Sequence, residues 1–122
     1  MPIRDFPDEW YEQAAVIDWV SLQHPWLTDH IIYIMADLKC SARVGNMLNK
    51  MGRKKGRCDL FFAYPNKSKF GLFIEMKTLT GKPTKEQLEF IKRMNNFNYY
   101  ACVSYGADAA IEIIKKYLAN EL

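Results

Sequence analysis

The sequence predicts an α/β fold in which helices cover both faces of a central mixed β-sheet of about four strands. Two observations support this prediction. Segments with helical periodicity alternate with short β-rich segments along all 122 residues, and no repeat, low-complexity tract or linker interrupts them. The two central strand candidates, Cys58–Tyr64 and Phe70–Thr78, carry large apolar residues on both faces, which is typical of strands covered on both sides. We therefore expect residues 1–122 to form a single domain.

Composition and charge set the class of protein. Apolar residues make up 49% of the chain and the net charge is +3, so the chain is globular and permits a polyanionic partner without requiring one. Cys40, Cys58 and Cys102 form no CxxC pair, which argues against a zinc site or a disulfide framework and fits a reducing cytosol. No apolar run approaches the roughly 18 residues of a membrane span, and the N-terminus lacks a signal-peptide pattern. We expect a cytoplasmic protein with no membrane partner.

The first helix is expected from Asp8 to about Gln23. Asp8 follows a proline and is a candidate N-cap, and acidic residues early in the segment suit a helix N-terminus. Val16 and Val20 follow a helical stripe, and Glu12 lies one turn before Val16 on the same stripe. A carboxylate at the end of a buried face is unusual. From this pattern alone, the simpler interpretation of Glu12 is a glutamate at the rim of an amphipathic helix.

A strand, a second helix and a basic loop follow. His30–Met35 is a short β-rich run. Ser41 is the expected N-cap of a helix that ends at Gly52 and carries apolar residues at helical spacing, namely Val44, Met47, Leu48 and Met51. The segment from Gly52 to Arg57 is a basic loop. Such loops are usually solvated surface, but this one leads directly into Asp59, where it is suited to hold a phosphate backbone.

The third helix begins with a capping box. Thr84 and Gln87 have the spacing at which a glutamine side chain bonds back to the N-cap amide, which is a sufficient structural reason for Gln87. Tyr99–Tyr105 is a fourth strand, and an apolar stripe after it predicts a terminal helix. The expected order is therefore helix, strand, helix, hairpin, helix, strand, helix.

The hairpin carries two carboxylates that face each other. A turn-forming run centred on Lys67 joins its strands, and Asp59 and Glu75 each lie eight residues from that centre, so they stand opposite each other. Side chains alternate along a strand, so Lys77 shares their face while Met76 points into the core. Opposed carboxylates with Cβ atoms about 4.5–5.5 Å apart repel each other. We therefore expect a cation between them.

A magnesium ion suits this arrangement. Mg²⁺ prefers oxygen ligands, takes one or two carboxylates and keeps several waters, and the backbone carbonyl of Met76 is available as a further ligand. Such an ion lowers the pKa of a bound water and neutralises charge on a phosphoryl oxygen. Lys77 then orients the attacking water or stabilises the developing negative charge. Alone, the spacing from Asp59 to Glu75 and Lys77 is a weak signal, because an acidic residue followed by a lysine is common on strands.

In its context, this spacing resembles the VRR-NUC family, a branch of the PD-(D/E)XK nuclease superfamily, and in particular its small stand-alone phage and bacterial members. The resemblance covers nearly the whole chain and rests on three runs: Gly52…Gly56-Arg57-Cys58-Asp59-Leu60, Gly71-Leu72-Phe73-Ile74-Glu75-Met76-Lys77 and Gly81-Lys82…Gln87. It implies a restriction-endonuclease-like core. The chain departs from the family at Cys58, where proline is common, and Cys58 itself is best explained as a small apolar residue.

The resemblance also implies roles for individual residues. It implies a catalytic set: Asp59 and Glu75 with the Met76 carbonyl as metal ligands, Lys77 as the catalytic lysine, Glu12 as a first-helix acid that approaches the metal through water, and Gln87 beside the site. Glu12 and Gln87 thereby gain a functional interpretation besides the structural one. Phosphate contacts are expected from basic residues chosen by position rather than by motif: Arg53, Lys54, Lys55, Arg57, Lys82 and Lys85.

The implied activity is Mg²⁺- or Mn²⁺-dependent endonucleolytic hydrolysis of DNA, with 5′-phosphate and 3′-hydroxyl products. By resemblance to stand-alone members, we expect branched DNA such as four-way (Holliday) junctions, a homodimer, and a bacterial or phage-infected host cell. A dimer would cover Trp10, Trp19 and Trp26, although burial in a core explains tryptophans more often.

Two alternatives remain open. One is an inactive nuclease-fold module for DNA binding or assembly, which the complete set of expected residues disfavours. The other is a nuclease of the same chemistry acting on another nucleic-acid substrate.

Overall fold

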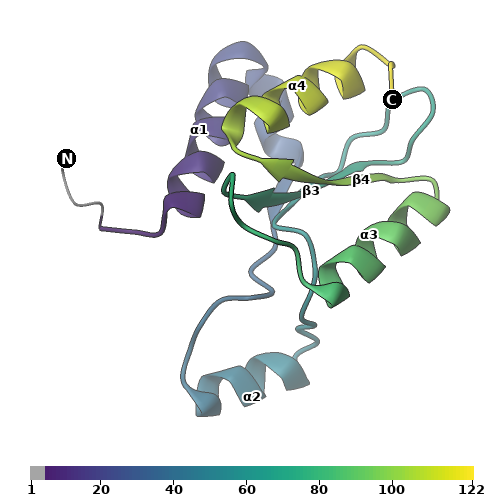
Figure 1. Cartoon of the computed structure of the whole chain (residues 1–122). Helices are drawn as coiled ribbons and strands as arrows, with labels where there is room; N and C mark the ends of the chain where they lie inside the picture. The colour runs from purple at the N-terminus through teal and green to yellow at the C-terminus, as the bar shows by residue number, and fades with distance from the viewer. Residues whose placement is uncertain (1–4) are drawn as a thin grey trace.

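A computed structural model describes residues 5–122 as a four-stranded mixed sheet with helices packed on both faces (Figure 1). The elements are α1 (Asp8–Gln23), the 3₁₀ helix η1 (Pro25–His30), β1 (Ile31–Tyr33), α2 (Ala42–Lys50), β2 (Leu60–Phe62), β3 (Leu72–Lys77), α3 (Lys85–Asn96), β4 (Tyr100–Tyr105) and α4 (Ala107–Leu118). The predicted fold class is confirmed, and η1 is an addition to the expected order. Within the described residues, no helix combines the length and the apolar character needed to cross a membrane.

The strands follow the order β1-β2-β3-β4, with antiparallel pairing up to β3 and parallel pairing between β3 and β4. In the hairpin, Leu60 pairs with Ile74 and Phe62 pairs with Leu72, so the chain folds back about Lys67 as predicted. The two hairpin strands are shorter than the predicted ranges. In β2, for example, regular pairing starts at Leu60 rather than at Cys58. Continuing the same register by one residue sets Asp59 opposite Glu75.

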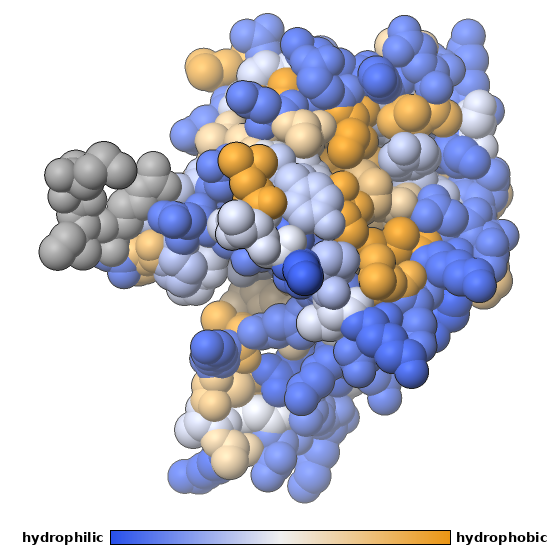
Figure 2. Space-filling model, viewed as in Figure 1, coloured by the Kyte–Doolittle hydropathy of each residue, from blue (hydrophilic) through white to orange (hydrophobic). Residues whose placement is uncertain are grey.

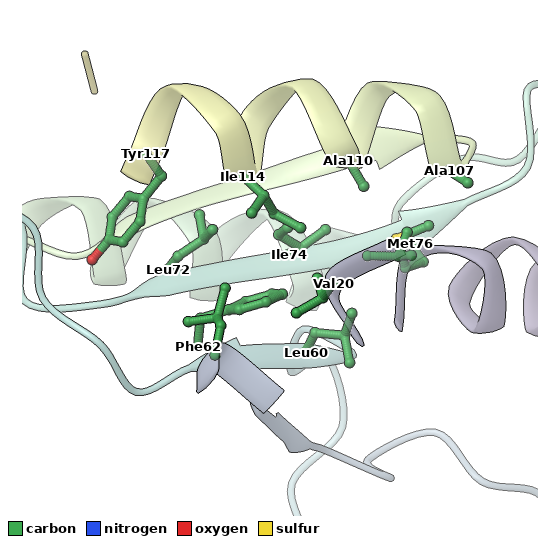
Figure 3. Packing of buried hydrophobic residues seen from close by; sticks show 12 residues of the cluster. Val20, Leu60, Phe62, Leu72, Ile74, Met76, Ala107, Ala110, Ile114 and Tyr117 are labelled. Atoms are coloured by element: carbon green, nitrogen blue, oxygen red, sulfur yellow. The ribbon is translucent and has the colours of Figure 1, made fainter. Parts of the chain in front are cut away.

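Two apolar cores lie on opposite faces of the sheet. On one face, α1, η1 and α4 pack against β2 and β3, and Figure 3 shows Val20 and Ile114 pointing toward the strands from the two helices. Met76 belongs to this core and is fully buried, as predicted. On the other face, Phe90 of α3 packs edge-on against Phe73 of β3. The hairpin is therefore covered on both sides.

Helix α1 differs from the prediction at its N-terminus. Asp8 is the first helical residue, and the N-cap is Pro7, which is extended and makes no side-chain cap bond. The prediction that Asp8 is the N-cap is therefore wrong, although Asp8 and Glu9 do lie in the first turn, where acidic residues suit the helix dipole. The caps predicted at Ser41 and Thr84 are confirmed, including both bonds of the Thr84 capping box.

Helix α2 covers neither face of the sheet. It projects from the body of the molecule on two long connections (Figure 1) and makes no substantial packing contact with another described helix or strand. Val44, Met47 and Met51 are 48%, 56% and 74% exposed, and Gly45 is its buried residue. The Arg53 side chain lies against Gly45, since a Cβ added to Gly45 would be 3.4 Å from Arg53 Nη2. Helices cover both faces of the sheet as predicted, and α2 does not take part in this cover.

Candidate active site

Three carboxylates from different parts of the chain meet at one end of β2 and β3. They belong to Glu9 in the first turn of α1, Asp59 just before β2, and Glu75 in β3. One oxygen from each lies within 4.8 Å of the others. Asp59 and Glu75 are the pair expected from the hairpin, whereas Glu9 was not predicted. Clustered carboxylate oxygens of this kind are ligands that hard divalent cations prefer.

Glu75 is the most buried of the three carboxylates. Its side chain is 1% exposed, and its Oε1 lies 3.4 Å from Lys77 Nζ. Its Oε2 is buried and accepts no hydrogen bond from the described part of the chain. A buried carboxylate oxygen without a partner is costly, because it has lost its hydration and gained nothing in exchange. This unsatisfied oxygen, inside a group of three carboxylates, fits a divalent cation such as Mg²⁺ or Mn²⁺.

Asp59 is held in place across the hairpin. Its Oδ2 accepts a 2.7 Å hydrogen bond from the Met76 amide, so its side chain extends the bonding between the two strands where the regular β2 pairing stops. Burial raises the pKa of Asp59 above the ordinary carboxyl range, and the Met76 bond partly opposes that shift. The hydrogen bond thus turns the Asp59 carboxylate toward β3, beside Glu75.

The pKa of Glu75 is also raised, first by burial and then by the charge of Asp59, while Lys77 acts in the opposite direction. Glu9 contributes a smaller repulsion that raises the pKa of both Asp59 and Glu75. Ionised carboxylates are therefore disfavoured here unless a cation is bound.

Gln87 connects the cap of α3 to this cluster. Its Oε1 accepts a 2.8 Å bond from the Thr84 amide, which leaves the Nε2 group facing the carboxylates as a donor. Nε2 donates to Glu75 Oε1 at 2.8 Å and to Asp37 Oδ2 at 3.2 Å. The capping box therefore fixes the orientation of the amide, and the amide in turn fixes Glu75. Neither Asp37 nor this contact was foreseen, because Asp37 lies 50 residues away in an irregular segment.

Glu12 lies outside the group of three carboxylates. Its Oε2 accepts a 2.7 Å hydrogen bond from the backbone amide of Ala107, the first residue of α4. Glu9 precedes it by three residues on the same helix, and side chains at that spacing lie on the same side. The sequence therefore offered two acids on one helical face, and nothing in their spacing distinguished the one that reaches Asp59.

The basic loop approaches the site because it packs against the start of α3. Gly56 has φ 75°, and a Cβ there would lie 2.4 Å from Glu86 Cβ, so only glycine fits this position. The Gly56 amide also donates to Asp37 Oδ1 at 3.5 Å. The loop is thereby held next to Gln87 and the carboxylates.

The six predicted phosphate-binding residues fall into two groups. Lys54, Lys55 and Lys82 are exposed, and so is Lys85, which lies 4.0 Å from Glu89 on the same helix. The two arginines are half-buried and make contacts within the chain. Arg53 donates to Asn49 Oδ1 and to the Leu38 carbonyl.

Arg57 stacks over the ring of Phe90 and donates to the Lys55 carbonyl. Both arginines therefore shape the loop, and the lysines present its charge to solvent.

Comparisons with known proteins agree with this fold. The model of the VRR-NUC domain family matches residues 7–108. A solved structure described as a "VRR_NUC domain protein" has a TM-score of 0.77 and 28% sequence identity, over 91% of this chain and 88% of that chain. No curated protein matched. The family model spans the chain from α1 to β4 and includes Glu9, Asp59 and Glu75, and the chain belongs to the VRR-NUC domain family.

Proposed function

We propose that the protein is a Mg²⁺- or Mn²⁺-dependent endodeoxyribonuclease that hydrolyses phosphodiester bonds. Membership of the VRR-NUC family supports nuclease activity in general. The observation that carries the metal-dependent mechanism is the buried Oε2 of Glu75, which has no hydrogen-bond partner among residues 5–122 and lies in a group of three carboxylates. Without a cation, the carboxylates of this cluster repel one another in a poorly hydrated environment. A bound metal ion would offset this repulsion and replace the lost hydration.

Asp59 and Glu75, with the backbone carbonyl of Met76, would hold the metal ion. When bound, the ion supplies a Lewis acid and a water of lowered pKa for attack on the phosphorus. Lys77 is 14% exposed and its ammonium lies beside Glu75, where it stabilises negative charge on the phosphoryl oxygens or orients the attacking water. Gln87 keeps the Glu75 carboxylate in one orientation during the reaction.

We propose that the DNA backbone crosses the basic loop to reach this site. Lys54 and Lys55 are exposed in the loop that packs against the start of α3, and Lys82 and Lys85 are exposed just before and at that helix start. Contacts between lysines and phosphates are independent of sequence and weaken as salt is added. Arg53 and Arg57 contribute indirectly, since their internal contacts hold the loop in shape.

Branched DNA and a homodimer complete the proposal. Resolving a four-way junction requires cuts in two strands, so two copies of the acidic site acting together suit that substrate. The exposed apolar face of α2 supports self-association, because a nine-residue helix is too short to be stable in water without tertiary contacts. A groove of about 630 Å³ runs beside α2 and is lined by apolar side chains such as Met35, Leu38 and Leu48.

Figure 2 shows the α2 segment as a lobe at the bottom of the view, with apolar side chains among the charged ones. Trp10 and Trp26 are 49% and 46% exposed, whereas Trp19 is partly buried against the core. If tryptophans take part in the dimer, Trp10 and Trp26 are therefore better candidates than Trp19.

A cleavage assay tests the activity and the substrate together. Labelled four-way junction, flap, duplex and single-stranded DNA are incubated with Mg²⁺, Mn²⁺ or EDTA, using the wild type, Asp59→Ala and Lys77→Ala. We expect metal-dependent cutting of the junction by the wild type and none by either variant. Asp18→Asn, on an exposed face of α1, is a matched control that should cut normally.

Cutting in EDTA, or full activity in Asp59→Ala, would refute the mechanism. Binding without cleavage in either metal would instead favour a DNA-binding module. If RNA were cleaved in preference to every DNA substrate, metal-dependent phosphodiester hydrolysis would stand, and DNA would be the wrong substrate.

A further inference from the structure

We propose that two glutamates of α1 have separate tasks: Glu9 is the acid that faces the metal, and Glu12 is a positioning residue that holds α1 by capping α4. The proposal rests on the metal site proposed above, which has its own support in the buried Glu75 oxygen that lacks a hydrogen-bond partner in the described part of the chain. It replaces the expectation that Glu12 approaches the metal through water.

The contact of Glu12 is a helix cap supplied from another part of the chain. Helix α4 starts after Gly106, which has φ 90° and offers no side chain to bond the free amides of the first turn. Ser, Thr, Asp or Asn usually provides that acceptor. Here Glu12 provides it, with Oε2 2.7 Å from the Ala107 nitrogen and 95 residues away in sequence. A carboxylate at this position also suits the positive end of the helix dipole.

This cap joins α1 to the strand that carries the site. The Gly106 amide donates to the carbonyl of Lys77 at 2.9 Å, so the start of α4 is tied to the end of β3. Figure 3 shows Ala107 at the start of α4 close to Met76 of β3. Glu12 bonds to Ala107, and the Lys77 carbonyl lies one hydrogen bond further on. Glu12 therefore links α1 to the end of β3 through the start of α4, in addition to the core packing of Val16 and Val20.

The fully buried side chains of α1 lie outside its N-terminal half. Val16 and Val20 are the buried residues of α1, and both lie in its second half. Pro7 gives the helix no side-chain cap, and Trp10 is 49% exposed. The bond from Glu12 therefore fixes the turn that carries Glu9, and this turn brings Glu9 within 4.8 Å of Asp59 and Glu75.

The hydrogen bond between Glu12 and Ala107 also distinguishes the role of Glu12 from that of Glu9. Oε2 of Glu12 is occupied by the bond to Ala107, and Glu12 does not belong to the group of three carboxylates. Glu9 already has an oxygen in the group, so it can serve the metal directly or through water while Glu12 remains bonded to Ala107. Both glutamates are thus needed for the site, but for different physical reasons.

Four variants of the full chain distinguish the two roles: Glu9→Gln, Glu9→Ala, Glu12→Gln and Glu12→Ala. Mn²⁺ affinity is measured by calorimetry, and the melting temperature is measured in EDTA. We expect both Glu9 variants to weaken Mn²⁺ binding by about tenfold or more, with an equal or higher melting temperature. Glutamine at position 12 keeps an acceptor for Ala107, so Glu12→Gln should resemble the wild type in both measurements.

Glu12→Ala removes the cap. We expect a lower melting temperature in EDTA, faster hydrogen exchange of the Ala107 amide and weaker Mn²⁺ binding, all restored in Glu12→Gln. Equal loss of Mn²⁺ affinity in Glu12→Gln and Glu9→Gln would overturn the proposal, as would an unchanged melting temperature in Glu12→Ala.

Asp59→Asn shows whether the metal site itself is correct. If wild type and Asp59→Asn bind Mn²⁺ equally, the metal site is wrong and the task given to Glu9 fails with it. The melting and exchange data on the Glu12 variants still decide the capping role, because neither requires metal. Loss of affinity in Asp59→Asn with none in Glu9→Gln would keep the proposed function and overturn only the role of Glu9.

Discussion

The acidic cluster buries charged groups, whereas helix α2 exposes apolar ones. At the cluster, charged groups are buried: Glu75 is 1% exposed, and one of its oxygens has no hydrogen-bond partner among the described residues. On α2, apolar groups are exposed: Met47 and Met51 are more than half accessible to solvent. Both arrangements cost free energy in the isolated chain, one through lost hydration and the other through apolar contact with water.

This difference indicates which kind of ligand or partner each region would bind. The cluster is held rigidly by bonds from the Met76 amide and from Gln87, so it is prepared for a small, charged ligand of defined geometry. Helix α2 is held by the internal contacts of Arg53 and by little else, so it suits a broad apolar partner. Chemistry at the cluster and association through α2 should therefore be separable by mutation.

The largest expected effect is on catalysis at the cluster. Lys77→Met removes the ammonium beside Glu75, and we expect the cleavage rate constant to fall by about 10²–10³-fold. DNA affinity should change little, because Lys77 is mostly buried and the exposed lysines of the loop remain. Single-turnover cleavage and a gel-shift titration measure the two quantities. Lys92→Met, on the exposed face of α3, is the control, and equal rates in the two variants would contradict a catalytic role for Lys77.

Divalent metal should stabilise the fold through the same cluster. At about 100 times its dissociation constant, a bound ion raises the free energy of unfolding by about 2.7 kcal/mol. Asp59→Asn should abolish most of this gain and also raise the melting temperature in EDTA, because it removes charge repulsion while its amide oxygen still accepts from Met76. Thermal denaturation with and without metal tests this. An unchanged wild-type melting curve at millimolar Mg²⁺ and Mn²⁺ would rule out tight binding by two carboxylates.

Self-association should depend on α2 and leave the cluster intact. Met47→Glu places a charge on the apolar face. Burial of a methionine side chain in an interface contributes about 1.5 kcal/mol or more to association, so the dissociation constant of the dimer should rise at least tenfold. The melting temperature of the monomer should not change, since Met47 is 56% exposed. Light scattering after gel filtration measures the mass. Lys50→Glu, exposed on the same helix, is the control. A wild-type monomer at all concentrations would exclude this interface.

The stability of the fold should also depend on pH. The pKa values of Asp59 and Glu75 are raised in the folded state by burial. Above about pH 4 the unfolded chain therefore loses protons that the folded chain retains, so the free energy of unfolding in EDTA should fall as pH rises. Each unit of pKa shift corresponds to about 1.4 kcal/mol. Urea titrations of wild type and Asp59→Asn test the difference, and identical slopes against pH would contradict it.

Local patterns allowed much of the hairpin and the helix caps to be predicted. The register of Asp59 and Glu75 follows from a turn centred on Lys67, because alternation along a strand leaves one register with both acids on the same face. The capping box of Thr84 and Gln87 is a property of four consecutive residues. The end of α1 at Gln23 follows from the proline two residues later.

The remaining features depend on contacts between distant segments. Glu9 and Glu12 lie on the same side of α1, so only the position of α4 decides which one bonds to Ala107 and which one meets Asp59. Similarly, Val44, Met47 and Met51 form an apolar face whether or not anything covers it. The sequence pattern shows that a face exists, but its exposure is decided by the path of the flanking loops.

The α/β class, the facing carboxylates with Lys77 and the capping box of Thr84 and Gln87 are all encoded by residues close together in the chain. The bond from Gln87 to Glu75, the place of Glu9 in the cluster and the exposure of α2 became visible in the folded chain alone. These depend on how helices are placed against the sheet, which is a matter of packing among residues far apart in the chain.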